Sequence, residues 1–564
     1  MFLLLLMLLV VALVVGFVKR DGVVWWTKKL LNINQHAPFT ESKLITSTPA
    51  DADGNVELEV TVKTEIRMTG GATIDAKSVG AHNVTLLRVS DHAAVPAAVS
   101  VGTDGASLLL KPVSPLEPDT NYYFAVGNGL VDSTGRSLGS YACAFTTERR
   151  DKMDASVRFE RVELPTTSGQ GAGYTCVRVG PDRHLYASAD DGRIVRFPIA
   201  PDGSVGSAQS FDAVQKLHGG KRLMTGFDFD PASTREKIIL WTVHTWYGFE
   251  GSKDWQGVIT RLSGPNLELA EDVVINLPRS VRDHATNQCS FGPDGALYIP
   301  QGSNSAFGAP DPEGAMRPER VLNASILRLD VTKVTPGKPL DAKTERGGSY
   351  DPFAPGAPLT IVASGIRMPY DLVWADNGFI YTAVNGATAG GFTPAGPGAP
   401  ELRRVPNSEH DWLFKIDPKA PIKYHGHPNP HLKHYVLNGG NPTPDVDFAE
   451  VSEYPVGTKP DADWQPSAYD FGCHVSANGT LQYKSDVFGG VLKGMLIVCR
   501  YNVGSDLICI GLDEKGNVNR TITGLPGLTN LVNPLDVTED TTNGNLYVSE
   551  YGLQSICLLK PVLP

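Results

Sequence analysis

The chain has 564 residues, and its 61 acidic and 50 basic side chains give a formal net charge of −11. The basic residues are dispersed rather than clustered, so we expect no nucleic-acid partner. The length predicts more than one domain, and the 58 Gly and 41 Pro residues indicate a fold rich in turns. The seven cysteines lack CxxC spacing and therefore indicate no zinc site.

Residues 2–18 form an unbroken apolar run, which is followed by basic residues and by the pair Trp25-Trp26. A membrane-spanning helix needs about 20 apolar residues, and tryptophans commonly mark its interface with water. A cleaved signal peptide is the alternative, but its basic start and small-residue cleavage site are poor here. We expect residues 1–30 to be an uncleaved membrane anchor, with the domains on the periplasmic or extracellular side. The positive charges after the span favour the opposite orientation.

Residues 40–148 carry the next set of patterns. Residues 56–62 and, less cleanly, 106–112 alternate in polarity, which predicts short strands. The segment 116–126, the Asp-x-x-Gly turn at 132–135 and the closing strand around Phe145 follow. This order resembles bacterial Ig-like modules, which implies a β-sandwich of about 100 residues that acts as a spacer or adhesion unit.

From residue 157 to 564 the chain repeats a tight turn followed by a short apolar strand. The copies lie at 180–186, 228–241, 292–298, 375–381, 476–498 and 542–548. Repeats of roughly 40–50 residues with several short strands are typical of a β-propeller. We therefore predict an all-β protein whose C-terminal unit is a six-bladed β-propeller, with long loops in 300–360 and 387–470 on one face. Cys499 and Cys509 flank a predicted hairpin turn and could face each other.

The pair Asp283-His284 stands at a fixed distance before the third turn. A histidine beside a rigid strand end can act as a general base, because its pKa lies near neutrality. The alternative is that His284 only satisfies backbone groups in a loop.

Several motifs in the same order resemble the soluble quinoprotein glucose/sorbosone dehydrogenase family. They are Asp283-His284 with 291–295, 364–367, 384–387 and 424–430. The resemblance implies a propeller that binds pyrroloquinoline quinone (PQQ) at the end of its central channel. It also implies that His284, beside Asp283, takes the proton of a substrate hydroxyl while hydride moves to the quinone.

The resemblance assigns the remaining site residues as well. Arg367 is expected to polarise the quinone oxygens. Asn385 belongs to the cofactor site, and the carbonyls of Gly386 and Ala387 are expected to hold Ca²⁺, which prefers oxygen ligands. Arg500 is the remaining candidate partner for the carboxylates of PQQ.

The chain departs from the family pattern at three places. Met368 follows Arg367 where the family has asparagine, and Ser303 stands where an aspartate orients the histidine. The cationic residues that clamp PQQ have no counterpart in 531–536. These departures affect the predicted activity more than the predicted fold.

The tract 424–434 contains His425, His427, His431 and His434. Histidine is a common ligand of transition metals, which makes a metal site one interpretation. The surrounding prolines favour an irregular loop, and this is the interpretation we prefer.

Three functional hypotheses follow. The first is a PQQ- and calcium-dependent dehydrogenase that oxidises a sugar or polyol outside the cytoplasm. The second is a non-catalytic propeller that binds carbohydrate or a protein partner. The third is a calcium-dependent lactonase or other hydrolase, although the expected ring of carboxylates is missing. The sequence identifies neither the substrate nor the electron acceptor.

Overall fold

The computed structural model describes residues 45–563 except 51–52, 69, 90–92, 119, 128, 139–140, 148–156, 336 and 444–448. The predicted anchor in residues 1–30 lies outside these residues. In the part that is described, no helix is long and apolar enough to cross a membrane. This part is nearly all β-structure with a single α-helix, α3 (Ala213–His218), so the all-β prediction is confirmed. Its 3₁₀ turns are η1 (Ala76–Ser78), η2 (Pro165–Thr167), η3 (Val331–Lys333), η4 (Pro430–Leu432) and η5 (Tyr551–Leu553).

Two four-stranded sheets form the unit that resembles an Ig-like module. One contains β1 (Ile45–Thr48), β3 (Val62–Ile66), β6 (Ser107–Pro112) and β5 (Ala97–Val101), in that order. The other contains β2 (Asp53–Val56), β8 (Tyr141–Thr147), β7 (Asn121–Val126) and β4 (Val84–Arg88). Buried Val62, Leu108 and Phe124 belong to one core cluster. The prediction of one strand over 56–62 is wrong, because residues 57–61 connect β2 to β3.

Six further sheets follow from residue 159, and we number them blades 1 to 6 in chain order. Blade 1 contains β10 (Tyr174–Val179), β11 (His184–Ala189), β12 (Ile194–Pro198) and β13 (Gln209–Phe211). Blade 2 contains β14 (Arg222–Phe229), β15 (Leu240–Trp246), β16 (Gly257–Ser263), β17 (Leu269–Leu277) and the short β21 (Leu340–Asp341). Blade 3 contains β18 (Ser290–Phe291), β19 (Leu297–Gln301), β20 (Ser325–Leu329) and β22 (Leu359–Ser364).

The remaining blades have the same strand order. Blade 4 contains β23 (Val373–Trp374), β24 (Ile380–Val384), β25 (His410–Ile416) and β26 (Tyr469–Cys473). Blade 5 contains β27 (Ala477–Gln482), β28 (Leu496–Arg500), β29 (Asp506–Leu512) and β30 (Val518–Ile522). Blade 6 contains β31 (Pro534–Asp540), β32 (Asn545–Glu550), β33 (Ser555–Pro561) and β9 (Phe159–Glu163).

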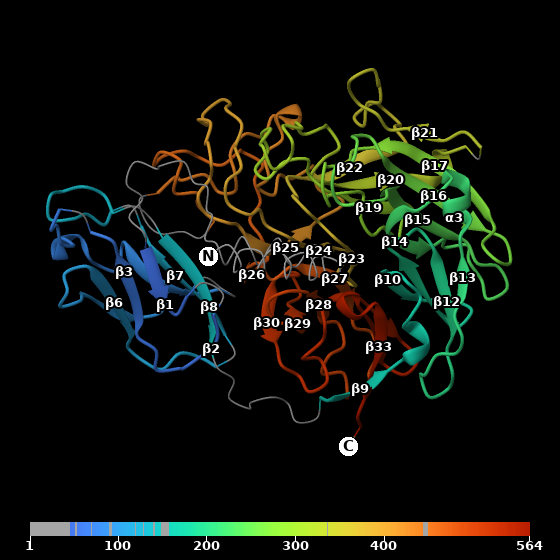
Figure 1. Cartoon of the computed structure of the whole chain (residues 1–564), viewed down its shortest axis with the longest axis horizontal. Helices are drawn as coiled ribbons and strands as arrows, with labels where there is room; N and C mark the ends of the chain where they lie inside the picture. Colours follow the sequence, from blue (N-terminus) through green and yellow to red (C-terminus); the bar gives the residue numbers. More distant parts are fainter. Residues whose placement is uncertain are drawn as a thin grey trace, which may run out of the picture. The chain divides into compact units, whose positions relative to one another are not determined.

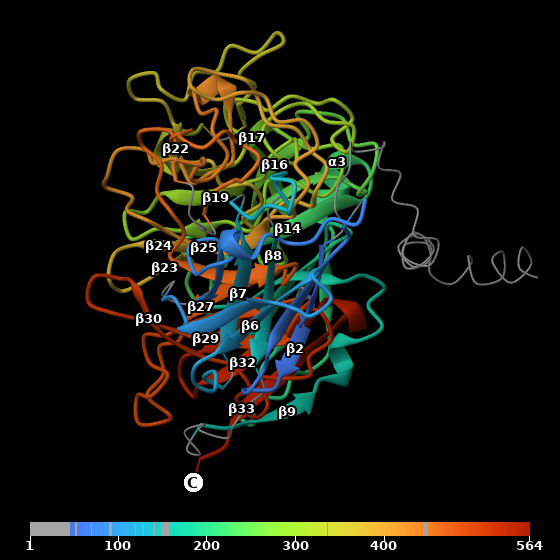
Figure 2. The same cartoon turned by 90° about the vertical axis from the view of Figure 1, so that its left-hand side faces the viewer.

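Strand β9 joins the beginning of this unit to its end. It pairs antiparallel with β33, so that Glu163 lies opposite Cys557. Figures 1 and 2 both show β9, near the start of the unit, beside the C-terminal β33. Each of the six successive sheets has four antiparallel strands, to which blade 2 adds the short parallel β21. With the last sheet completed by an N-terminal strand, this is the strand order of a β-propeller.

The repeated turns mark the second strand of most blades. The turn beginning at Gly292 precedes β19, and the one ending at Gly544 precedes β32. The predicted position of the fifth turn is wrong, because residues 477–479 lie inside β27 and the turn before β28 comes later. This error arose because Asn-Gly also occurs within a strand with an irregular register, here between Ala477 and Thr480.

The hydrophobic core lies between neighbouring blades. Val243 of blade 2 and Ile299 and Leu327 of blade 3 are fully buried members of one cluster. All five residues of β19 and of β24 are buried. Such strands lose the simple alternation of polar and apolar residues because both of their faces are covered. The two cysteines predicted to face each other do not, since Cys499 lies opposite Leu507 and Cys509 opposite Ile497, and both are free thiols.

Charged side chains tie the first strands of the blades together. Arg178 on β10 lies 3.1 Å from Asp536 of β31 and 3.6 Å from Asp371, just before β23. Asp536 also accepts a hydrogen bond from the amide of Val177, and Asp371 accepts one from the amide of Thr480. Asp371 is therefore a structural residue that links blades.

Strand direction brings the candidate residues to one face. Because successive strands of a blade are antiparallel, all second strands end at the same edge of the sheets, which we call the upper face. The loops that leave β17, β19, β22 and β24 there contain His284, Ser303, Arg367 and Asn385, respectively. The long insertions predicted over 300–360 and 387–470 are each divided by a strand, β20 in the first and β25 in the second.

Candidate functional site

The imidazole of His284 is held by one neighbouring residue. Its Nδ1 lies 3.1 Å from the backbone oxygen of Ser303 and 3.0 Å from the Ser303 hydroxyl. A carbonyl oxygen can only accept, so Nδ1 carries the proton and Nε2 keeps its lone pair. No hydrogen bond to Nε2 is formed by the residues that the structure describes. His284 is half-buried, and its Nε2 is therefore a fixed acceptor.

The surroundings of His284 favour its neutral form. Burial and the positive charge of Arg367 lower the pKa of His284 to about 4, against the opposing effect of Asp283. The imidazole is consequently unprotonated at neutral pH and ready to accept a proton. Its basicity is lower than that of a solvent-exposed histidine.

Asp283 lies beside His284 without orienting it. No hydrogen bond joins the two side chains among the described residues. Burial raises the pKa of Asp283, but the charges of His284 and Arg367 outweigh this effect and lower it. Asp283 thus contributes negative charge, while Ser303 performs the orienting role that the sequence comparison gave to that position.

Arg367 is fixed by backbone oxygens. Its Nε donates to Ala306 at 3.2 Å, and its Nη1 donates to Asn385 at 3.0 Å and to Gly386 at 2.9 Å. The backbone oxygen of Arg367 in turn accepts a hydrogen bond from the amide of Ser303 at 2.8 Å, which links it to the residue that holds His284. Nη2 has no hydrogen bond within the described chain. One edge of a half-buried guanidinium therefore stays available to an anion.

The carbonyls of Gly386 and Ala387, which were predicted to bind calcium, accept hydrogen bonds from the protein instead. The oxygen of Gly386 accepts from Arg367, and that of Ala387 accepts from the amide of Glu409 at 2.8 Å. A guanidinium on the same carbonyl opposes binding of a second cation there. These residues do not fit the predicted Ca²⁺ site, and we assign no step to this metal.

Asn385 has one polar atom without a partner. Its Nδ2 donates to Asn478 Oδ1 at 3.0 Å, whereas its buried Oδ1 has no hydrogen bond within the described structure. A buried acceptor of this kind costs free energy unless a ligand or water supplies a donor. The backbone oxygen of the same residue accepts a hydrogen bond from Nη1 of Arg367. Asn385 therefore fits a ligand-binding role.

Arg500, the predicted partner of the PQQ carboxylates, is engaged by Asp506. Two bonds of 2.6 Å join Nε to Oδ1 and Nη2 to Oδ2, and both side chains are buried. The two residues lie directly opposite each other on β28 and β29. The prediction that Arg500 binds cofactor is not supported, because its charge is already neutralised.

The histidine tract does not converge on one point. His427 contacts Glu319 at 3.2 Å, His434 contacts Asp463 at 3.0 Å, and His431 lies 3.7 Å from Glu345. Both ring nitrogens of buried His425 have no partner in the described structure. The tract supplies no group of three metal ligands among the described residues.

An exposed aromatic loop was missed by the sequence analysis. Trp246, Tyr247 and Phe249 are 41%, 42% and 52% exposed. Buried Arg279 ties this loop to the site, because it donates to Gly248 at 3.0 Å and to the backbone oxygen of His284 at 2.8 Å. Three aromatic residues within four positions, beginning with the last residue of β15, were the signal that could have revealed it.

Both units of the chain are similar to known proteins. Residues 39–147 match the family of bacterial Ig-like domains. No curated protein matches the chain in sequence. Solved structures that are similar include a glucose dehydrogenase-type oxidoreductase from Thermus thermophilus, with 18% identity, coverage of 72% of this chain and 100% of that chain, and a TM-score of 0.44.

Two further similar structures have PQQ in their descriptions. The PQQ-bound aldose sugar dehydrogenase of Streptomyces coelicolor is 15% identical, over 72% of this chain and 99% of its own, with a TM-score of 0.45. The PQQ domain of pyranose dehydrogenase from Coprinopsis cinerea is 13% identical, over 72% of this chain and 97% of its own, with a TM-score of 0.47. These likenesses are too weak to assign an activity, which has to be inferred from the residues of the chain itself.

Proposed function

We propose that this protein oxidises a hydroxyl-bearing carbon of a sugar or polyol as a quinone-dependent dehydrogenase. The observation that carries the proposal is the free Nε2 of His284, held beside Arg367 by Ser303. The order of the motifs around His284, Arg367 and Asn385 supports it. Those motifs resemble the glucose/sorbosone dehydrogenases.

His284 is the proton acceptor of the proposed reaction. Its Nε2 takes the proton of the substrate hydroxyl, and the hydroxyl oxygen forms a carbonyl with its carbon. The hydrogen on that carbon leaves as hydride, with both electrons of the C–H bond. A bound quinone of the PQQ type would accept that hydride and its two electrons. Ser303 keeps the proton of neutral His284 on Nδ1, so that Nε2 is always the receiving atom.

Arg367 and Asn385 are the proposed binding groups for the electron acceptor. The free Nη2 of Arg367 can donate to an oxygen that gains negative charge during reduction. The unsatisfied Oδ1 of Asn385 can accept a hydrogen bond from the same ligand. Arg500 has no part in this role, so we expect PQQ to bind weakly.

The aromatic loop supports a carbohydrate as substrate. The C–H face of a sugar ring packs on an aromatic ring, and Trp246, Tyr247 and Phe249 are exposed on a loop fixed to His284 through Arg279. A small acyclic alcohol would not use this surface. The loop therefore favours a ring-sized substrate.

The purified full chain, in detergent, provides the test. PQQ is added with CaCl₂ or with EDTA, a series of aldoses and polyols follows, and bleaching of the quinone absorbance is recorded. We expect at least one sugar to reduce the quinone. The rates should be similar in both buffers, because the carbonyls of Gly386 and Ala387 already accept hydrogen bonds from the protein. No reduction by any substrate would contradict the dehydrogenase. A strict need for calcium would contradict our assignment of Gly386 and Ala387.

A non-catalytic propeller is the second candidate. The ion pair of Arg500 with Asp506 favours it, because it engages one candidate cation for a cofactor with three carboxylates. In that case the aromatic loop should bind sugar while PQQ has no effect. Isothermal titration with the same sugars, without PQQ, distinguishes the two.

We further propose that residues 1–30 anchor the protein in a membrane and that the other domains lie outside the cytoplasm. The apolar run 2–18 supports this proposal. Mass spectrometry of the mature protein would contradict it if the N-terminus lies beyond residue 20.

A further inference from the structure

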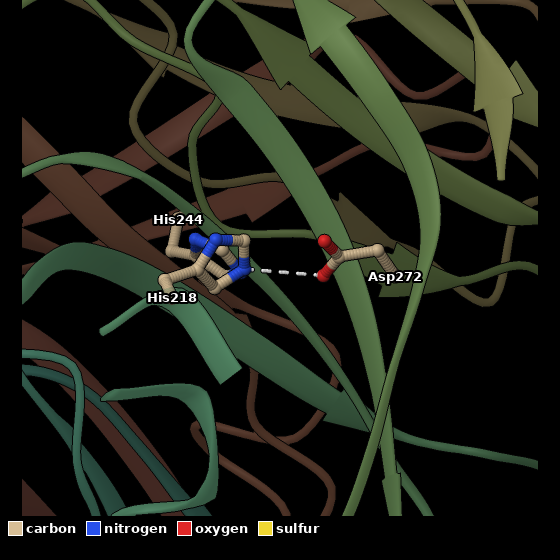
Figure 3. A group of neighbouring side chains, drawn as sticks. All are labelled: His218, His244 and Asp272. Carbon is tan, nitrogen blue, oxygen red and sulfur yellow. Dashed lines mark hydrogen bonds and ion pairs between the residues drawn. The ribbon is translucent and has the colours of Figure 1, made fainter. Parts of the chain in front are cut away.

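Two histidines and an aspartate meet at blade 2, and none of the three has a role in the proposed oxidation. His218 lies in the last turn of α3, His244 near the end of β15, and Asp272 in the middle of β17. One ligand atom from each lies within 4.8 Å of those of the other two. Figure 3 shows both imidazoles on one side and the carboxylate facing them. The group therefore joins three separate elements around one point.

The fold fixes each of these side chains. Thr260 on β16 lies opposite Asp272 of β17, and the neighbouring β15 places His244 opposite Val258. Helix α3 ends directly after His218 at Gly219, whose positive φ of 68° stops the helix. The two imidazole rings are 4.9 Å apart, edge to face. Only small movements are needed to bring the ligand atoms to a common ion.

The hydrogen bonds within the group form one chain. Arg222 Nε donates to His244 Nδ1 at 3.2 Å, so the proton of neutral His244 is on Nε2, which donates to Thr260 at 2.7 Å. Thr260 donates to Asp272 Oδ1 at 2.6 Å, and His218 Nε2 lies 3.2 Å from the same oxygen. Oδ2 of Asp272 receives no hydrogen bond from described residues. One carboxylate oxygen thus remains open.

We propose that His218, His244 and Asp272 bind a divalent transition metal ion of the zinc type. Two imidazole nitrogens and one carboxylate oxygen are a common donor set for Zn²⁺, and water completes the four ligands. The side chains of His218 and Asp272 are 19% and 21% exposed, which gives an ion access from solvent. The buried His244 provides the inner ligand. This site does not depend on the proposed oxidation.

Metal binding requires a rearrangement around Arg222. To ligate through Nε2, His244 has to move its proton to Nδ1, which then repels the Nε donor of Arg222. Arg222 can turn away while its Nη2 keeps the bond to the oxygen of Gln256. Arg222 therefore weakens binding in the natural protein. Replacing it with glutamine, whose oxygen can accept from Nδ1–H, should strengthen binding.

Equilibrium dialysis of the EDTA-treated full chain against ZnCl₂ tests the proposal. We expect one Zn²⁺ per chain that is lost, or bound at least about 100-fold more weakly, in Asp272→Asn and His218→Ala. Arg222→Gln should bind about tenfold more tightly than the natural chain. His184→Ala is the matched control and should leave binding unchanged. His184 lies 3.1 Å from Asp182 but belongs to no group of three possible ligands among the described residues.

Cobalt provides a second measurement, which reports on the ligands of the ion in the natural chain itself. Co²⁺ in a low-coordinate site of nitrogen and oxygen ligands gives visible absorption bands, which should appear with the natural chain and not with Asp272→Asn. Equal zinc binding by the natural chain and by both ligand variants would overturn the proposal. So would the absence of any bound ion at micromolar concentration, or weaker binding in Arg222→Gln.

Discussion

Arg367 and Arg500 both lie at the upper face of the propeller, yet their surroundings differ. Arg367 is held by three backbone oxygens and keeps one edge free. Arg500 is clamped by the carboxylate of Asp506 through two short bonds. Neutral carbonyl oxygens fix the guanidinium of Arg367, so no carboxylate in direct contact compensates its charge. The charge of Arg500 is compensated by the carboxylate of Asp506. An arginine that is to bind an anion needs the first kind of environment.

The two arginines also differ in what surrounds them along the chain. Arg367 stands in a loop of blade 3 that contacts the loops of Ser303 and Asn385, where long insertions bring polar backbone together. Arg500 ends a strand of a short hairpin and meets its partner across that hairpin. Long loops thus build a candidate site, while the short hairpin builds a structural ion pair. The following predictions test this distinction.

His284→Ala should have the largest effect on the proposed activity. It removes the proton acceptor, and we expect turnover to fall by about 10²–10⁴-fold, the usual contribution of a positioned general base. The fold should persist, because among the described residues the side chain forms hydrogen bonds with Ser303 alone. Steady-state rates with PQQ and the best sugar measure the change, and His184→Ala serves as control. Unchanged turnover would show that His284 has only a structural role.

Arg367→Gln should lower turnover by about 10²–10³-fold, the range found when one donor to a developing negative charge is removed. Glutamine can still donate to one backbone oxygen, so part of the loop structure is retained. Arg367→Lys keeps the positive charge but loses the planar set of guanidinium donors. Its turnover should lie between those of the natural protein and Arg367→Gln. Rates at saturating PQQ separate this effect from weaker cofactor binding. Equal rates in all three proteins would remove Arg367 from the site.

Arg500→Ala should instead lower stability. It leaves the carboxylate of Asp506 buried without its partner, and breaking a buried pair in this way costs about 3–5 kcal/mol. Urea unfolding followed by tryptophan fluorescence measures the loss, and Arg500→Leu with Asp506→Leu should recover much of it. Turnover per folded molecule should not change. If PQQ affinity falls while stability is kept, Arg500 belongs to the cofactor site after all.

The sequence predicted the β-structure well because propeller turns have strong local signals. Gly-Pro-Asp-Gly at 292–295 adopts the turn that its composition indicates, and Gly295 has a positive φ of 74° there. The failed assignment at 476–479 shows the limit, since Asn478-Gly479 has turn composition inside strand β27. Local composition cannot distinguish a hairpin turn from an irregular strand start.

The site was predictable only in part. His284, Ser303 and Arg367 were found from motifs, and the structure brings them together through Ser303. The engagement of Arg500 by Asp506 and of Gly386 by Arg367 depends on which side chain reaches which acceptor in space. The link from Arg279 to the aromatic loop likewise joins residues distant in sequence. No spacing rule indicates such contacts.

The smallest effect that we expect is a shift in the pH dependence of kcat/KM. Variants of Arg367 and Arg500 should differ in this shift. The pKa of His284 is about 4, below its ordinary value of 6.5, because of burial first and the charge of Arg367 second. The neutral base is therefore present above pH 4, and kcat/KM should stay level from about pH 7.5 down to about pH 5. In Arg367→Gln the second cause is gone, so the acid limb should move upward but stay below the ordinary value. Arg500→Ala should leave the limb in place.

Asp411 requires a control, because burial raises its pKa to about 6 and it accepts a hydrogen bond from the amide of Gly386. Its protonation as pH falls could loosen the loop that holds Arg367. Asp411→Asn mimics the protonated form at every pH. If a limb near the pKa of Asp411 disappears in Asp411→Asn, it belongs to this carboxyl group. If the limb remains in Asp411→Asn and moves upward when the charge of Arg367 is removed, it reports the titration of His284. This result would identify His284 as the proton acceptor.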